Sequence, residues 1–303
     1  RASSGSEILL PGAISPLTMA AWMRRNTCSE RAGHRVNREF AVYREVGFRT
    51  VHGWLDRDVL AIAEVLDQVQ RDKGVAGSVA EIGVHRGKLF IGLSLLRREG
   101  ESAVAIDIFD DQELNIDHSG LGNLKRFRAN VERWATLDGV KIHQGDSTKV
   151  QTDALRELAG SDIRFFSVDG GHTEEIVLSD MRLAESVLAD GGVVIADDVF
   201  NEHWPGVSVA ILRYLDQGGK LVPFLVGFNK MFLAHPDYVA DYRAAVESAF
   251  EDSLLDLVWP SAFAGHPLTI IAHRHAIQIV TGVLKRSKAV RAAYTQLTGR
   301  TPS

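Results

Sequence analysis

The feature that most constrains the fold is a series of short apolar runs that alternate with longer amphipathic segments. From residue 78 onward the runs read SVAEIGV, AVAIDIF, VKIHQG, IRFFSVDG and GVVIADDV. Strands that are apolar on both faces and separated by helices form a parallel sheet covered on both sides. Two further runs, LVPFLVG and MFLAH, predict terminal strands, and Pro223 predicts an edge position for the first of them. We therefore expect an α/β fold with a doubly wound, mostly parallel, seven-stranded sheet.

The chain divides into three predicted regions. Residues 1–52 show weak periodicity and predict an N-terminal helical arm, whereas residues 53–235 hold the sheet. In this central region Asp56 can cap a helix that ends before Gly74, and helices are also expected at 89–98, 121–134, 152–158, 174–188 and 207–215. Residues 236–303 predict a C-terminal helical extension with helices at 236–250 and 276–297 and one candidate strand, LTIIAHR.

Composition narrows the classes of partner. The formal charge is −5, from 34 basic and 39 acidic residues, and no long run of like charge occurs. Binding to nucleic acid or to an anionic membrane by counterion release is not expected, and no apolar stretch approaches the ~18 residues of a membrane helix. The single cysteine, Cys28, excludes an internal disulfide and suits a reducing compartment. We expect a cytoplasmic protein that acts on a small molecule and can form a homo-oligomer.

The turn after the first strand carries the first candidate site residues. Ligands of open parallel sheets bind at the carboxyl ends of the strands. There Gly83 permits a tight turn and Gly87 permits close approach at a helix start. The segment has neither the second glycine of a dinucleotide fingerprint nor the spacing of a P-loop, so a pyrophosphate ligand is not expected. Glu81 would instead attract a cation, such as the sulfonium and ammonium of S-adenosylmethionine; alternatively it only ends the strand beside Arg86.

The second and third strands end in further acidic residues. Asp107 follows Gly87 by about 20 residues, the distance at which an acid binds ribose hydroxyls in such folds. Asp146 and the Ser147 hydroxyl could bond an adenine edge. Asp146 could equally cap the next helix or hold its own turn. An adenosine-containing cofactor is the prediction.

Three aspartates end the fourth and fifth strands and predict a metal site. Asp169 ends one strand, and Asp197 with Asp198 ends its neighbour. Three adjacent carboxylates repel one another by several kcal/mol at an effective dielectric of ~20, so they need protonation or a metal ion. Oxygen ligands select hard cations, with Mg²⁺ favoured and Mn²⁺ or Ca²⁺ as alternatives. The competing interpretation is a helix cap and an arginine partner.

A histidine follows the metal-site aspartate closely. His172 lies on the loop after Asp169 and, with an ordinary pKa of ~6.5, can accept a proton near neutral pH. The alternative is a solvated loop residue. Trp54 and Trp134 are expected in the core, and the segment at Trp204 is either a substrate wall or a surface turn.

These residues resemble the class I S-adenosylmethionine-dependent methyltransferases. More narrowly, they resemble the metal-dependent O-methyltransferases of the macrocin and mycinamicin type, which modify sugar hydroxyls of natural products. The matching segments are EIGVHRG, AIDIFDDQ, QGDS, VDGGH and LADGGVVIADDV, within a stretch from Gly53 to Lys230. The histidine of DGGH favours this branch, because catechol-type enzymes have lysine in its place.

The resemblance implies a role for each candidate residue. The methyl donor would be held by Glu81, Gly83, Asp107 and Asp146, with Gly87 and Ser147 beside them. Asp169, Asp197 and Asp198 would hold Mg²⁺, and His172 would be the base in methyl transfer to an acceptor hydroxyl. Residues 53–235 would form the S-adenosylmethionine-dependent domain.

Other functions fit parts of the pattern. A catechol or phenol O-methyltransferase and a hydroxylase-like relative share the architecture. A nicotinamide-dependent dehydrogenase shares the ribose-binding acid, but Glu81 and the missing glycine oppose it. A non-catalytic binding module would leave the metal-site aspartates and His172 without a role.

Overall fold

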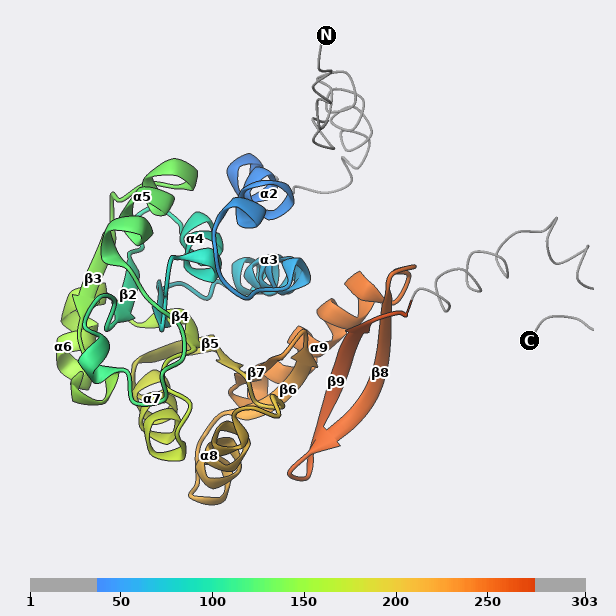
Figure 1. Ribbon diagram of the computed structural model, residues 1–303. Coiled ribbons are helices and arrows are strands. Elements are labelled where there is room, and N and C mark those ends of the chain that lie inside the picture. Colours follow the sequence, from blue (N-terminus) through green and yellow to red (C-terminus); the bar gives the residue numbers. More distant parts are fainter. Residues whose placement is uncertain (1–36, 276–303) are drawn as a thin grey trace, which may run out of the picture. The chain divides into compact units, whose positions relative to one another are not determined.

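The computed structural model describes residues 37–275, and Figure 1 traces this part of the chain. Its helices are α2 (Arg38–Glu45), α3 (Arg57–Asp72), α4 (Lys88–Leu95), α5 (Leu124–Trp134), α6 (Thr152–Ala159), α7 (Glu174–Val187), α8 (Pro205–Asp216) and α9 (Pro236–Phe250). Its strands are β1 (Ser78–Ile82), β2 (Ala103–Asp107), β3 (Val140–Gln144), β4 (Ile163–Val168), β5 (Leu188–Asp197), β6 (Val222–Gly227), β7 (Lys230–Ala234), β8 (Asp256–Phe263) and β9 (His266–His273). Short 3-10 turns are η1 (Gly47–Thr50), η2 (Gln112–Leu114) and η3 (Ser147–Lys149).

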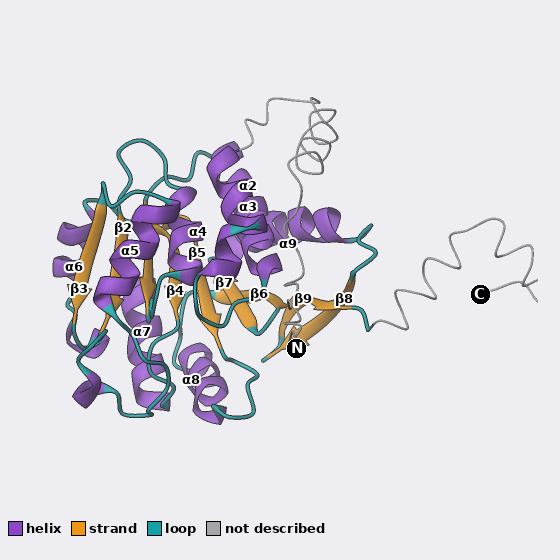
Figure 2. Cartoon of the chain, turned by 45° about the horizontal axis from the view of Figure 1, so that its top comes forward, coloured by secondary structure: helices purple, strands orange, loops and turns teal. Residues whose placement is uncertain are grey.

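All described strands belong to one sheet of order β3-β2-β1-β4-β5-β7-β6-β9-β8. The first five pair in parallel, and β7 enters antiparallel between β5 and β6. Figure 2 shows β3 near one end of the sheet and β8 near the other. The predicted doubly wound α/β fold is confirmed. The predicted count of seven strands is wrong, because β8 and β9 extend the sheet beyond β6.

Helices cover both faces of the sheet, as the apolar strands require. On one face the buried side chains of α2, α3, α4, α5 and α9 form one core cluster with the strands. On the other face α6, α7 and α8 form a second cluster. Figure 1 shows α3, α4 and α5 on the opposite side of the sheet from α7 and α8. The carboxyl ends of β1 to β5 therefore remain open for a ligand.

Local sequence signals set several helix boundaries. Asp56 caps α3, and its Oδ1 accepts a hydrogen bond from the Asp58 amide at 2.9 Å. Gly74, with φ of 69°, follows the end of this helix. Pro236 occupies the first turn of α9, where its missing N–H costs no helical bond. None of the helices between residues 37 and 275 is long and apolar enough to span a membrane.

The structure corrects two expectations about the C-terminal half. The extension is not entirely helical, because β8 and β9 form an antiparallel pair that docks on β6. Consequently β6 is not an edge strand: Pro223 lies beside a shift in the β6–β7 register, an irregularity that tolerates a residue without an N–H. The expected helix at 276–297 and most of the arm at 1–52 lie outside the described residues.

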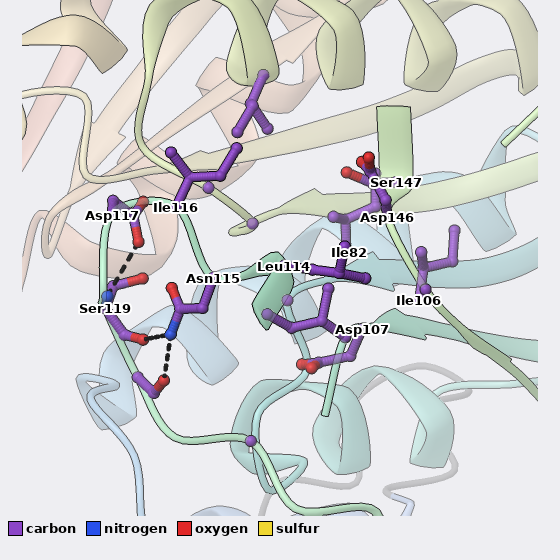
Figure 3. Close-up of a pocket in the computed structure, with 18 of the residues that line it drawn as sticks. Ile82, Ile106, Asp107, Leu114, Asn115, Ile116, Asp117, Ser119, Asp146 and Ser147 are labelled. Atoms are coloured by element: carbon purple, nitrogen blue, oxygen red, sulfur yellow. Dashed lines mark hydrogen bonds between the residues drawn. The ribbon is translucent and has the colours of Figure 1, made fainter. Parts of the chain in front are cut away.

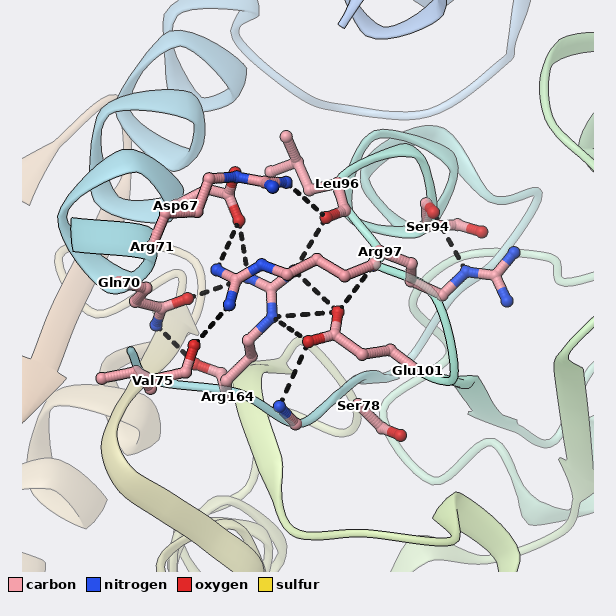
Figure 4. A network of polar contacts seen from close by, with 12 residues as sticks. Asp67, Gln70, Arg71, Val75, Ser78, Ser94, Leu96, Arg97, Glu101 and Arg164 are labelled. Carbon is pink, nitrogen blue, oxygen red and sulfur yellow. Dashed lines mark hydrogen bonds and ion pairs between the residues drawn. The ribbon is translucent and has the colours of Figure 1, made fainter. Parts of the chain in front are cut away.

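A fully buried arginine joins the layers on the α3 face (Figure 4). Arg164 of β4 pairs with Asp67 of α3 at 2.9 Å and with Glu101, which precedes β2, at 3.0 Å. It also donates to Gln70 Oε1 and to the Leu96 carbonyl, each at 2.8 Å. Because every partner comes from another segment, this cluster fixes α3 and the α4–β2 connection against the sheet.

Candidate functional site

Two cavities open side by side at the carboxyl ends of the parallel strands. The first, of about 330 Å³, lies over β1, β2 and the turn after β3. The second, of about 750 Å³, lies over β1, β5 and the β6–β7 turn. Gly83, Asp169 and Gly170 line both cavities. A molecule in one cavity would therefore contact a molecule in the other at the ends of β1 and β4.

The two glycines of the first turn have left-handed backbones, as expected. Gly83 has φ of 82°, and a Cβ there would lie 1.7 Å from the Asp169 carbonyl oxygen. Gly87 has φ of 89° and begins α4. Gly83 is thus required for the close approach of the turns after β1 and β4. Gly83 lines the first cavity, whereas Gly87 does not line that cavity.

Glu81 is a buried carboxylate without a hydrogen bond at Oε2 in the described part of the chain. Burial raises the pKa of Glu81 to about 8, and the positive charge of Lys230 opposes this shift. It lines the second cavity rather than the first. An unsatisfied acid at this position is suited to a cationic or N–H-bearing group in the second cavity.

Asp107, Asp146 and Ser147 all line the first cavity, as Figure 3 shows. Asp107 accepts the amides of His85 at 2.6 Å and of Phe109 at 2.5 Å, so it also holds the turns after β1 and β2 together. Asp146 holds its own turn, because Oδ1 accepts the amide and the hydroxyl of Thr148. Asp146 therefore holds its own turn, as one of the alternatives predicted, and it also lines the first cavity.

The loop after β2 forms one wall of the first cavity (Figure 3). Asn115 folds this wall, since its Nδ2 donates to the carbonyls of Ser119 at 2.7 Å and Gly120 at 3.2 Å. The same loop carries Asp117, which accepts the amide of His172 at 2.6 Å. The first cavity and the predicted base are thus joined through one loop.

His172 lies between two carboxylates. Its Nδ1 is 2.8 Å from Asp117 Oδ2, and its Nε2 is 3.1 Å from Asp198 Oδ2. Burial lowers the pKa of His172, but the hydrogen bonds to Asp198 and Asp117 outweigh burial and raise it. The ring stacks on Trp204 at 4.3 Å. Trp204 lines the second cavity, so the wall interpretation of this segment matches its position.

Three groups converge at the ends of β4 and β5. Potential ligand atoms of Asp169, His172 and Asp198 lie within 4.8 Å of one another. Burial raises the pKa of Asp169, and the charge of Asp197 adds to this shift. The pKa of Asp198 is lowered to about 2, because hydrogen bonds from His172, Asn201 and Asn229 outweigh its burial. The structure thus brings Asp169 and Asp198 together with the predicted base. Asp197, the third predicted ligand, lies beside Asp169 within side-chain hydrogen-bond reach, but it is not part of this converging group.

Asp197 has a different partner, Lys230. Lys230 Nζ lies 2.5 Å from Asp197 Oδ2 and 3.6 Å from Asp169 Oδ2. Burial lowers the pKa of Lys230, but the charges of Asp197 and Asp169 outweigh burial, so that the pKa is raised overall. This lysine was not among the predicted site residues, although its place directly after Phe228-Asn229, where two predicted strands meet, was a usable signal.

Trp54 corrects another expectation. It is not a core residue, because its side chain is 76% exposed and lines the second cavity. Its ring stacks on His85 at 5.7 Å. Trp134, by contrast, is partly buried against the core and contacts Tyr43, as expected.

Residues 80–199 match the family model described as a methyltransferase domain. This segment is a methyltransferase domain. The predicted methyltransferase class is therefore confirmed for this segment. The methyltransferase domain contains every residue that the sequence analysis placed in the site, whereas Lys230 and the second-cavity residue Trp54 lie outside it. The individual roles of the site residues stay predictions.

Solved structures similar to the chain include two that are described as methyltransferases and one that is described only as cofactor-bound. The O-methyltransferase NovP is 16% identical, with 58% of this chain and 80% of that chain covered and a TM-score of 0.48. CalS11, a TDP-rhamnose 3'-O-methyltransferase of calicheamicin biosynthesis, is 17% identical over 74% of this chain and 96% of that chain, with a TM-score of 0.44. Cofactor-bound Rv0187 from MTB is 14% identical over 74% and 98%, with a TM-score of 0.45. No curated protein matches the sequence.

Proposed function

We propose that the protein is a metal-dependent O-methyltransferase that moves a methyl group from S-adenosylmethionine to a hydroxyl of a small-molecule acceptor, a sugar of a natural product. One observation carries the proposal. The first cavity, lined by Asp107 and Asp146, meets the second at Asp169, and there a histidine held by Asp117 lies beside Asp198. The sugar as acceptor rests on the DGGH resemblance alone.

The residues present fit both groups that the reaction needs. The first cavity offers carboxylates for ribose and adenine, and Glu81 Oε2 is a buried acceptor without a partner among residues 37–275. Asp169 and Asp198 offer hard oxygen donors that suit Mg²⁺ or Mn²⁺. When bound, S-adenosylmethionine would supply an electrophilic methyl group and the cation would supply Lewis acidity.

The side chains then perform three tasks. Asp107 and Asp146 position the donor over β2 and β3, and Asp169 lies where the cavities meet. Asp117 holds Nδ1 of His172 and fixes the ring orientation, so the acceptor's proton would go to Nε2. In the structure Nε2 faces Asp198 Oδ2 at 3.1 Å, and it must leave this carboxylate before it can accept the proton. Trp204 stacks on one face of the imidazole. Positioning two reactants in adjoining cavities converts their encounter into a step within one complex.

The test combines binding with turnover. Calorimetry should show binding of S-adenosylhomocysteine and no binding of NADH. Labelled S-adenosylmethionine with Mg²⁺ and a panel of glycosides and phenols should yield a methylated glycoside, and EDTA should stop its formation. Full activity in EDTA would remove the metal from the proposal, and NADH binding would replace it with a dehydrogenase.

His172→Asn tests the proton acceptor. We expect kcat to fall by roughly 10²–10⁴-fold, because a positioned general base contributes about that much, while the affinity for S-adenosylhomocysteine stays unchanged. His203→Asn is the matched control, since this exposed neighbour bonds to Asn201 within its own turn. Equal kcat in both variants would exclude His172 as the base.

A further inference from the structure

The strand register places a lysine directly against the acidic centre. In the antiparallel β5–β7 pair Lys230 lies opposite Asp197, and side chains at such positions start only ~5 Å apart at Cβ. Lys230 is 2% exposed, so its charge has no access to bulk solvent. Its contacts with Asp197 at 2.5 Å and Asp169 at 3.6 Å are therefore its means of charge compensation.

Both oxygens of Asp197 are engaged. Oδ2 faces Lys230 Nζ at 2.5 Å, and Oδ1 accepts the amide of Asp198 at 2.9 Å. Asp198 has a different orientation, because its left-handed backbone, with φ of 57°, turns the chain after the end of β5. Its Oδ2 faces His172, which belongs to the converging group that includes Asp169 but not Asp197.

We propose that Lys230 is a positioning residue that holds Asp197 as its counter-ion, so that the divalent cation is bound through Asp169 and Asp198 without Asp197. The inference rests on the proposed metal site and concerns its ligands. The fixed positive charge of Lys230 also repels the divalent cation, so Lys230 lowers the affinity of the site for the metal. Adjacent aspartates thus have separate tasks: Asp197 neutralises the lysine and Asp198 binds the metal.

Mn²⁺ binding to the full chain, measured by electron paramagnetic resonance, tests this without turnover. In the wild-type background, Asp197→Asn should change the Mn²⁺ Kd by less than about threefold, whereas Asp169→Asn should weaken binding by more than about tenfold, a difference well above the usual error of additivity. Lys230→Met should tighten Mn²⁺ binding by about tenfold or more, because it removes the neighbouring positive charge.

The decisive result is the coupling between Lys230 and Asp197. In the Lys230→Met background Asp197 is free to bind the metal, so adding Asp197→Asn should now weaken Mn²⁺ binding by about tenfold. Lys230→Arg, which keeps the charge, should leave Asp197→Asn without effect. A purely structural role for Lys230 would not make the effect of Asp197→Asn depend on this charge. Lys220→Met removes a positive charge at an exposed position and is the control: Asp197→Asn should also have no effect on Mn²⁺ binding in this background.

Each outcome decides between the claims. If Asp197→Asn weakens Mn²⁺ binding as much as Asp169→Asn in the wild-type background, Asp197 is a ligand and the inference is wrong. This comparison decides even if Lys230→Met fails to fold. If Asp197→Asn has the same effect on the Mn²⁺ Kd in the wild-type and Lys230→Met backgrounds, the inference is also wrong. If the wild-type chain binds no Mn²⁺, the metal site of the proposed function fails first, and the inference fails with it.

Discussion

At the scale of single residues, Asp180 is a buried acid that the reaction does not use. It lies on α7 and is 1% exposed. Burial raises the pKa of Asp180 to about 7; Ser147 opposes this shift and Asp146 adds to it. The folded protein therefore holds a proton that the unfolded chain, with an aspartate pKa of ~3.9, has already released.

This shift gives Asp180 a pH-dependent effect on stability. Between pH ~4 and about 7 the folded state binds more protons, so the free energy of unfolding falls as the pH rises. We expect Asp180→Asn to reduce the loss of stability between pH 5 and pH 8 by about 2–3 kcal/mol, measured by urea unfolding. Asp216→Asn, a change at an exposed residue of α8, should leave the stability at pH 5 and at pH 8 unchanged. Equal pH profiles for wild type and Asp180→Asn would contradict the prediction.

Two glycines separate backbone strain from collision. Gly83 and Gly218 have similar φ values of 82° and 84°, but a Cβ at Gly83 meets the Asp169 carbonyl, whereas a Cβ at Gly218 meets nothing within 4 Å. Gly218→Ala should therefore cost only about 1 kcal/mol of stability, the cost of the left-handed backbone. Gly83→Ala should cost several kcal/mol more and abolish S-adenosylhomocysteine binding, as thermal unfolding and calorimetry would show. Equal losses would show that the turns after β1 and β4 can separate.

At the scale of elements, the Arg164 cluster holds α3 and the α4–β2 connection against β4. Arg164→Met would leave Asp67 and Glu101 buried without their cation, and breaking one side of a buried pair costs about 3–5 kcal/mol. Urea unfolding should show a loss of this size. Arg156→Met removes an exposed pair with Asp162 and should cost less than about 1 kcal/mol. A similar small loss for Arg164→Met would mean that water replaces the arginine.

The sequence predicted most elements, because local apolar periodicity determines them. The strands β1 to β5 and the helix from Pro236 to Phe250 follow directly from runs of apolar residues and from caps. It could not place Lys230 or Asp117 in the site, because their contacts depend on an antiparallel register and on the fold of a long loop. For the same reason it assigned Asp197 only to the metal, since an alternation of apolar residues does not show which charge lies opposite.

At the scale of the whole molecule, the segment after the proposed domain boundary at residue 235 belongs to the core. Tyr242, Val246 and Phe250 of α9 are buried in the same cluster as α3. A chain that ends at residue 235 should therefore fail to unfold cooperatively, whereas a chain that ends at residue 275 should retain a sharp thermal transition followed by circular dichroism. Cooperative unfolding of the shorter chain would show that residues 53–235 form an independent domain.

The short connection between β6 and β7 has a further consequence. Only Phe228 and Asn229 separate these strands, both with positive φ, and Asn229 also bonds Asp198. A residue inserted before Asn229 that moved β7 by one position along β5 would place the Asn229 amide opposite Asp197, in place of the ammonium group of Lys230. The charge balance of the candidate site is therefore set by the length of a hairpin loop as well as by the identity of any single amino acid.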